Sequence, residues 1–266
     1  MAPRVIKTAP QQHETELRQQ GYTLIGGIDE AGRGPLAGPV CSAVVIFDRE
    51  MDIPGVYDSK ALDAPQREQL YEIIMKRAVA VGIGLACAEE IDQINILRAT
   101  HLAARRALRH ARVMPHYLLL DALHLDRITI PQMSLTKGDS RSFSIAAASI
   151  IAKVTRDRIL AHSHHQYPEY NFQSNKGYAT ADHRAAIDRH GPTTFHRQTF
   201  LQSWFETRPA NHSQYYTTTS QQLQTSQCPQ EIRSILTTVR TQREWLPITE
   251  WNNLLRLCQT RLQNFE

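Results

Sequence analysis

Residues 27–40 read GIDEAGRGPLAGPV and place two adjacent carboxylates, Asp29 and Glu30, at the end of an apolar run. Neighbouring residues of a strand point to opposite faces, so a strand here would direct at least one carboxylate inward. Burying an unpaired carboxylate is expensive, and a divalent cation would offset that cost by supplying the opposite charge. A surface turn that keeps both acids in water explains the same residues equally well, so this stretch alone leaves the choice open.

Three glycines, Gly32, Gly34 and Gly38, follow the acidic pair. Because they have no Cβ atoms, they keep the backbone narrow, so that a ligand could approach main-chain N–H groups closely. Arg33 stands between the first two glycines and would hold a cation at a tight turn. These residues favour a turn that a ligand can approach, placed between two strands.

The flanking sequence alternates between strand-like and helix-like segments. Apolar runs bounded by turn residues predict strands, and apolar residues at helical spacing predict helices. Strands are predicted over residues 22–29, 38–47, 79–88 and 116–121 with a short pair in 127–135, and helices over 92–112, 142–164 and 182–190. Three neighbouring strands followed by helix–strand units predict an α/β fold, in which a mixed sheet carries helices on its faces.

Two further acids stand at the ends of predicted elements. Asp121 directly follows the apolar residues 117–120. It would lie where α/β sheets place ligands, and capping of the next turn is the alternative. Asp139, in Lys137-Gly138-Asp139, precedes the long predicted helix. For an isolated aspartate in that place, a helix cap is the favoured interpretation.

The combination of the four carboxylates changes these interpretations. Carboxylates at strand and helix ends suit a two-metal site for phosphodiester hydrolysis, in which cations about 3.5–4 Å apart activate the attacking water and stabilise the leaving 3′-oxygen. Mg²⁺ and Mn²⁺ prefer such oxygen ligands. Zinc would require His or Cys residues at a spacing that the sequence does not contain.

These residues belong to a series of sequence blocks that resembles ribonuclease HII over residues 24–200. After GIDEAGRGPLAGPV, the blocks are Asp58-Ser59-Lys60, NILRAT at 95–100, LLLDAL at 118–123, KGDS at 137–140, AAASIIAKVTRD at 146–157, GYAT at 177–180 with His183, and HGPTTFHRQTF at 190–200. With KGDS and AAASIIAKVTRD counted as one, these are seven blocks in the family order, a far stronger signal than any single motif.

The resemblance implies a ribonuclease H-like fold, a mixed five-stranded sheet flanked by helices. It assigns the catalytic, metal-binding role to four carboxylates that would hold two divalent ions, Mg²⁺ or Mn²⁺: Asp29, Glu30, Asp121 and Asp139.

The resemblance also implies substrate contacts. Gly32, Arg33 and Gly34 would read the 2′-hydroxyl of the ribonucleotide beside the cut, the group that distinguishes RNA from DNA. Tyr178 would pack on the sugar of the next, deoxy nucleotide, and Lys60 would contact a phosphate. The chain would therefore read a junction between RNA and DNA.

The activity implied is that of an endoribonuclease. Its partners would be RNA–DNA hybrids and DNA duplexes containing ribonucleotides, and the cut would lie 5′ of the ribonucleotide, leaving a 3′-hydroxyl and a 5′-phosphate. One alternative is a module that binds hybrids without cutting, against which the four acids argue. Another is a different nuclease of the same fold, such as a junction resolvase, which would leave Tyr178 and residues 32–34 without an evident role.

Bulk composition restricts the function less. The net charge of +4 is compatible with a polyanionic partner, but many unrelated proteins share it. The cysteines are scattered and predict free thiols in a reducing compartment: Cys41, Cys87, Cys228 and Cys258. No run approaches the roughly 18 apolar residues of a membrane helix, and the N-terminal 20 residues lack a signal peptide's apolar core. We expect a cytoplasmic monomer.

The composition changes near residue 200, and all 12 glycines lie at or before Gly191. We predict a polar N-terminal extension over residues 1–20 and a catalytic domain over 21–206. A Gln-, Thr- and Ser-rich segment at 207–230 buries too little apolar surface to order and is predicted to be a linker. Apolar residues at helical spacing predict a C-terminal helical appendage over 231–266, with no recognisable chemistry.

Overall fold

The computed structural model describes residues 7–206, 214–241, 246 and 248–265. The chain divides into two compact units. The first unit consists of Met1–Arg33 and Pro39–Ile159, and the second of Gly34–Gly38 and Leu160–Glu266.

The first unit contains a five-stranded mixed sheet with the order β3-β2-β1-β4-β5. The strands are β1 (Ile25–Ala31), β2 (Val40–Phe47), β3 (Ala80–Ala86), β4 (Tyr117–Asp121) and β5 (Gln132–Leu135). The first three are antiparallel neighbours, whereas β4 runs parallel to β1 and β5 parallel to β4. The predicted α/β fold with a mixed five-stranded sheet is confirmed.

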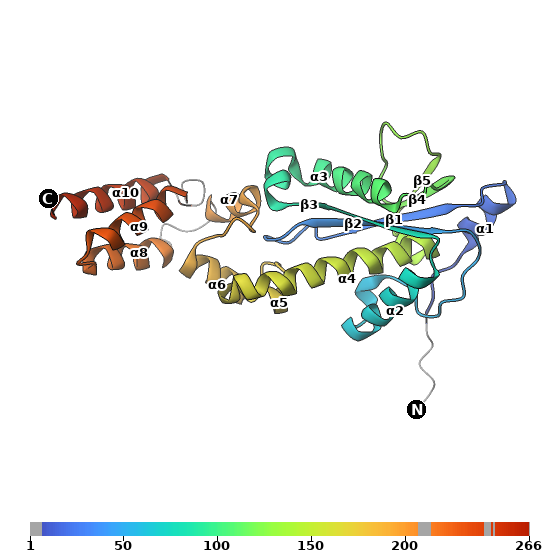
Figure 1. The fold of residues 1–266 in the computed structure, drawn as a ribbon, viewed down its shortest axis with the longest axis horizontal. Coiled ribbons are helices and arrows are strands. Elements are labelled where there is room, and N and C mark those ends of the chain that lie inside the picture. Colours follow the sequence, from blue (N-terminus) through green and yellow to red (C-terminus); the bar gives the residue numbers. More distant parts are fainter. Residues whose placement is uncertain (1–6, 207–213, 242–245, 247, 266) are drawn as a thin grey trace, which may run out of the picture. The chain divides into compact units, whose positions relative to one another are not determined.

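Helices cover both faces of this sheet (Figure 1). One face packs against α3 (Ala88–Ala111), and the other against α2 (Ala64–Arg77) and the first part of α4 (Phe143–Gln166). Glycines let the helices approach to backbone distance, since a Cβ on Gly27 would lie 2.0 Å from the carbonyl carbon of Ser144 in α4. Short helices complete this unit: η1 (Ser59–Ala61) and η2 (Gly138–Ser140).

The first 20 residues are more than a polar extension, which corrects the prediction. They include α1 (Gln12–Gln19), whose Leu17 packs beside Ile25 in the core. Glu14 is 1% exposed and accepts hydrogen bonds from Ser142 Oγ at 2.6 Å and from Ser144 N at 2.9 Å. A buried carboxyl group on α1 therefore ties the N-terminal segment to the start of α4.

The predicted strand pair in residues 127–135 is also wrong, because only β5 forms there. Arg127 adopts a left-handed backbone conformation with φ 59°. The Gln132 side chain bonds both the N–H and the carbonyl of Leu125, at 2.8 and 2.9 Å. The Gln132 side chain thus closes a loop before β5, and the residues between Leu125 and Gln132 form no second strand.

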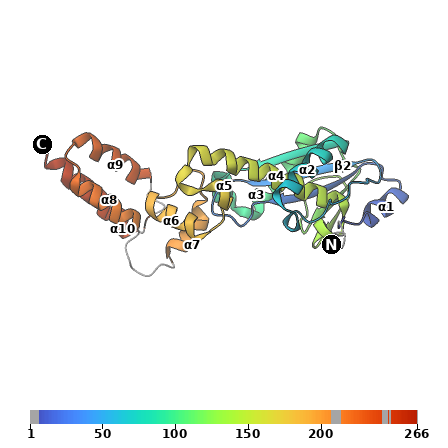
Figure 2. The same cartoon turned by 90° about the horizontal axis from the view of Figure 1, so that it is seen from below.

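The second unit is helical within the described residues. It contains η3 (Pro168–Tyr170), α5 (Phe172–Asn175), α6 (Ala181–His190), α7 (Gln198–Glu206), α8 (Gln214–Thr225), α9 (Pro229–Thr241) and α10 (Ile248–Gln263). Figure 2 shows α8, α9 and α10 side by side at the C-terminal end of the chain. The predicted C-terminal helices are thus present as α9 and α10.

Helix α8 corrects the prediction of a linker over residues 207–230, of which 207–213 lie outside the described residues. Tyr215, Thr219 and Leu223 recur every four residues and form a buried stripe on α8. Tyr215 and Leu223 pack against apolar side chains of α9 and α10, including Ile232 and Leu254. This narrow stripe is sufficient to bury one face of a helix that is otherwise polar. Among the residues that the structure describes, no helix is both long and apolar enough to cross a membrane.

Candidate active site

Asp29 and Asp121 emerge side by side at the carboxyl ends of two parallel strands. The β1–β4 register pairs Ile28 with Leu120, and each aspartate is the next residue of its strand. The carboxyl ends of parallel strands are where α/β sheets place ligands. Pairing of two distant segments, which the sequence does not display, therefore brings these two acids together.

Asp139 joins them from the turn that follows β5. Lys137 adopts a left-handed conformation, φ 56°, and begins the short helix η2 that carries Asp139. Gly138 N–H donates to Asp121 Oδ1 at 2.7 Å, which links the turn to the end of β4. Carboxylate oxygens of Asp29, Asp121 and Asp139 lie within 4.8 Å of one another.

Burial and mutual repulsion make this group a poor place for uncompensated negative charge. Asp29 is 6% exposed, and its pKa is raised well above the ordinary value, first by burial and then by the charges of Glu30 and Asp121. The pKa of Asp139 is also raised, by burial and then by Asp58 and Asp121. A divalent cation would relieve both effects, and carboxylate oxygens are the donors that Mg²⁺ and Mn²⁺ prefer.

Glu30 lies outside this three-aspartate group and has its own partner. Its Oε1 is 3.3 Å from Nη1 of Arg33. Burial raises the pKa of Glu30, and Arg33 acts in the opposite direction. Its other oxygen, Oε2, is buried without a hydrogen-bond partner among the described residues. An orphaned buried carboxylate oxygen beside Asp29 suits a further metal ligand.

The remaining predicted residues of the first unit surround the acids. Gly32 has φ +94°, and a Cβ there would lie 2.0 Å from Nε of the buried Arg156. The Arg33 side chain is 49% exposed. Lys60, in η1, is exposed, and its charge opposes the rise in the pKa of Glu30 and of Asp139 without cancelling it. A side-chain cation therefore stands near the acidic group.

Gly34 and Tyr178 belong to the second unit. A Cβ added to Gly34 would have no atom within 4 Å. Tyr178 is 46% exposed and directly follows Gly177, which has φ +81°. Gly177 O accepts from Leu36 N–H at 2.8 Å, so the Gly34–Gly38 loop and the turn before Tyr178 are joined by backbone bonding.

Asp58, in the block Asp58-Ser59-Lys60, was not predicted from the sequence to belong to the site. Asp58 caps η1 by accepting from Lys60 N at 2.9 Å, and it raises the pKa of Asp139. It therefore adds negative charge to the site and holds the turn that carries Lys60. The available signal was an acid two residues before Lys60, the lysine that the family resemblance assigns to a phosphate.

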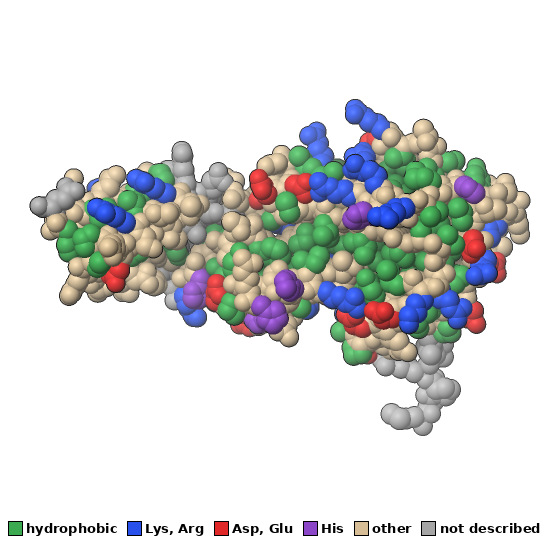
Figure 3. Space-filling view, in the orientation of Figure 1, with side chains coloured by type: hydrophobic (Ala, Val, Ile, Leu, Met, Phe, Trp, Pro, Cys, Tyr) green, Lys and Arg blue, Asp and Glu red, His purple; other side chains and the backbone are tan. Residues whose placement is uncertain are grey.

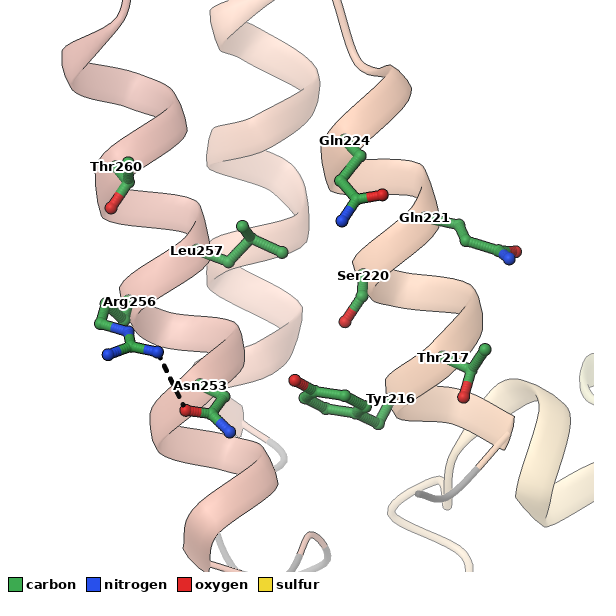
Figure 4. Close-up of a pocket in the computed structure, with 9 residues that line it drawn as sticks. All are labelled: Tyr216, Thr217, Ser220, Gln221, Gln224, Asn253, Arg256, Leu257 and Thr260. Atoms are coloured by element: carbon green, nitrogen blue, oxygen red, sulfur yellow. Dashed lines mark hydrogen bonds between the residues drawn. The ribbon is translucent and has the colours of Figure 1, made fainter. Parts of the chain in front are cut away.

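A separate groove of about 470 Å³ lies between α8 and α10 (Figure 4). Its lining is mostly uncharged and polar: Tyr216, Thr217, Ser220, Gln221, Gln224, Asn253, Arg256, Leu257 and Thr260. Figure 3 shows few charged side chains on the viewed face of these C-terminal helices. Because no carboxylate lines this groove, the acidic group on the sheet is the candidate for hydrolytic chemistry.

The fold is similar to that of solved ribonucleases H. The ribonuclease H2 from Pyrococcus horikoshii OT3 is 27% identical with a TM-score of 0.58, and the match covers 66% of this chain and 93% of that one. A PCNA:RNase HII complex from Archaeoglobus fulgidus contains a chain that is 25% identical with a TM-score of 0.55, covering 65% and 93%. The fold and the acidic site thus define an enzyme of the ribonuclease H class.

The family within that class follows from sequence comparison. The family model for Ribonuclease HII matches residues 26–206. A Ribonuclease HII of Clostridioides difficile is 50% identical over 190 residues, which are 71% of this chain and 74% of the relative. One of Syntrophotalea carbinolica is 50% identical over 192 residues, 72% and 92% respectively. The chain belongs to the ribonuclease HII family and is therefore an endoribonuclease for RNA–DNA hybrids, whereas α8, α9 and α10 lie outside the matched segment.

Proposed function

We propose that this enzyme also incises DNA duplexes 5′ of embedded ribonucleotides, and that it cuts both substrates with two divalent ions, leaving a 3′-hydroxyl and a 5′-phosphate. The observation that carries the proposal is the convergence of Asp29, Asp121 and Asp139, from three separate segments, within 4.8 Å. Membership of the ribonuclease HII family supports the substrate class.

The four acids Asp29, Glu30, Asp121 and Asp139 would hold the ions, Mg²⁺ or Mn²⁺. When bound, such ions activate the attacking water and stabilise the leaving oxygen of a phosphodiester. Arg33 fixes one oxygen of Glu30, which leaves the buried second oxygen available to a cation. Lys60 would neutralise a substrate phosphate that approaches the acids.

Recognition of the ribonucleotide would depend on residues 32–34. A 2′-hydroxyl can be bonded by main-chain groups where no side chain stands in the way. A Cβ added to Gly34 would point into open space. The backbone of Gly34 is therefore open to a ligand, and a side chain at this position would stand in the ligand's way. Tyr178 has an exposed ring that could pack on the next deoxyribose, where a missing hydroxyl is tolerated.

Cleavage of a DNA duplex with one internal ribonucleotide tests the proposal. With Mg²⁺ or Mn²⁺ we expect a single cut 5′ of the ribonucleotide, and mapping of the ends should give a 3′-hydroxyl and a 5′-phosphate. Chelation of the ion should remove the activity. A cut in the ribonucleotide-free duplex of the same sequence would indicate another nuclease, and binding without cleavage would indicate a binding module.

Replacing Tyr178 by Ala should weaken cleavage at a single ribonucleotide about tenfold, and less within long RNA stretches, because contacts with an aromatic ring are worth roughly 1–3 kcal/mol. The measurement is kcat/KM on both substrates. Tyr178→Phe keeps the ring and should behave like the wild type. Equal losses of kcat/KM on both substrates would contradict the proposal that Tyr178 recognises the junction between RNA and DNA.

Stabilisation of the enzyme by Mn²⁺ should increase with pH. The pKa of Asp29 is raised in the fold, so without an ion the folded protein loses stability as pH rises through that pKa. A bound ion offsets this loss of stability. At low pH a proton competes with the ion for the Asp29 carboxylate. The gain in melting temperature should thus be larger at about pH 8 than at about pH 5.5. An equal gain at both values, or an unchanged gain in Asp29→Asn, would count against metal binding by Asp29.

A further inference from the structure

Two buried histidines of the second unit face each other. His183 is 0% exposed and lies in α6, and His196 is 1% exposed and lies just before α7. Their Nε2 atoms are 3.0 Å apart, which is a hydrogen bond between two imidazoles. Such a bond requires one ring to donate through Nε2 and the other to accept there.

Neighbouring backbone groups fix which ring donates. Thr193 N–H donates to His196 Nδ1 at 3.0 Å, so this nitrogen accepts and the proton of His196 is on Nε2. His183 Nδ1 lies 2.8 Å from the carbonyl oxygen of Tyr178, which can only accept. His183 therefore carries its proton on Nδ1 and accepts from His196 at Nε2. The bonds run in one direction, from Thr193 through His196 and His183 to Tyr178.

The surroundings keep both rings neutral. Burial lowers the pKa of His196 to about 3 and also lowers the pKa of His183. The rings of Tyr170 and Phe172 pack around the pair, with ring centroids 4.9 Å from His196 and 5.4 Å from His183 respectively. A proton added to either histidine would leave two N–H groups facing each other, so the pair works only in its neutral form.

The same residues connect Tyr178 to the Gly34–Gly38 loop. An isolated bridge pairs His196 with Ala37, and Arg197 N–H donates to Leu36 O at 2.8 Å. Leu36 N–H in turn donates to Gly177 O. The histidine pair therefore closes a ring of hydrogen bonds that includes the loop after Gly34 and the turn that ends at Tyr178.

We propose that His183 and His196 are positioning residues, which hold Tyr178 against the Gly34–Gly38 loop and thereby set the preference of the enzyme for a ribonucleotide followed by a deoxynucleotide. This inference rests on the proposed function, in which Gly34 and Tyr178 contact adjacent sugars. Neither histidine touches the substrate in this account, and both act through the carbonyl of Tyr178.

The test compares kcat/KM on a duplex with one ribonucleotide and on a long RNA–DNA hybrid. His196→Leu should lower the ratio of the two values about fivefold, the effect of one lost hydrogen bond. His196→Gln, whose amide nitrogen can replace the Nε2 donor, should restore most of the ratio. Combining His196→Leu with Tyr178→Ala should lower the ratio no further than Tyr178→Ala alone. His165→Leu, an exposed histidine of α4, is the matched control and should leave the ratio unchanged.

A purely structural role would lower both kcat/KM values together, and that result would overturn the inference. Ring ¹⁵N shifts of the wild-type enzyme near neutral pH provide a second test that needs no variant. We expect opposite tautomers, with Nδ1–H on His183 and Nε2–H on His196, and identical tautomers or a charged ring would also overturn it. Absence of any cleavage at single ribonucleotides by the wild type would instead contradict the proposed function.

Discussion

Replacing Asp121 by Asn should reduce cleavage of an RNA–DNA hybrid by about a thousandfold or more, since a lost metal ligand removes several kcal/mol of transition-state stabilisation. The fold should remain, because the amide oxygen of Asn can still accept from Gly138 N–H, as Asp121 Oδ1 does at 2.7 Å. The measurements are the initial rate with saturating Mg²⁺ or Mn²⁺ and the melting temperature of both proteins.

Asp126→Asn provides the matched control for this loss. Asp126 is exposed in the segment between β4 and β5 and is not among the acids that converge on the site. Its substitution removes the same charge and should leave the cleavage rate unchanged. Wild-type turnover by Asp121→Asn would rule out its assignment as a metal ligand.

Replacing Gly27 by Ala should destabilise the enzyme by about 3 kcal/mol or more, because overpacking against a rigid neighbour is costly. The new Cβ would stand 2.0 Å from the carbonyl carbon and 2.2 Å from the oxygen of Ser144. Because these are backbone atoms, the clash cannot be relieved by a change of side-chain rotamer, and α4 must move away from β1. For a protein of this size, the melting temperature should fall by roughly 6–12 °C.

Gly34→Ala adds the same methyl group at a glycine that is not packed against other atoms. A Cβ at Gly34 meets no atom within 4 Å, and its φ is not in the left-handed region. Stability should therefore stay within about 0.5 kcal/mol of the wild type, as for other surface changes. Cleavage at a single ribonucleotide should fall, because the methyl group would occupy the approach of the sugar. A wild-type melting temperature for Gly27→Ala, or full activity for Gly34→Ala, would contradict the respective argument.

The sequence predicted the sheet and the acidic residues for different reasons. Long apolar runs made the main strands evident, since β2 is buried along its whole length. Asp29 and Glu30 alone favoured a buried site no more than a solvated turn. The convergence of Asp29 with Asp121 depends on the parallel β1–β4 register, which local patterns do not specify. Agreement of many blocks with one family supplied that missing information.

Elements that depend on few apolar residues could not be predicted in this way. Helix α1 is anchored by one apolar residue, Leu17, and by the buried carboxyl group of Glu14. Because a single apolar residue gives no helical pattern, the sequence of α1 looks like a polar extension. Helix α8 buries a stripe only one residue wide, including Leu223, within a Gln- and Thr-rich segment. The tautomers of His183 and His196 are set by backbone partners that only the folded chain brings near.

The most direct test is anomalous diffraction from crystals of this enzyme grown with Mn²⁺. We expect two manganese peaks, about 3.5–4 Å apart, bound by oxygens of Asp29, Glu30, Asp121 and Asp139. Crystals that diffract well but show no manganese among these four carboxylates, or show it bound elsewhere, would contradict the two-ion site on which the proposed mechanism depends.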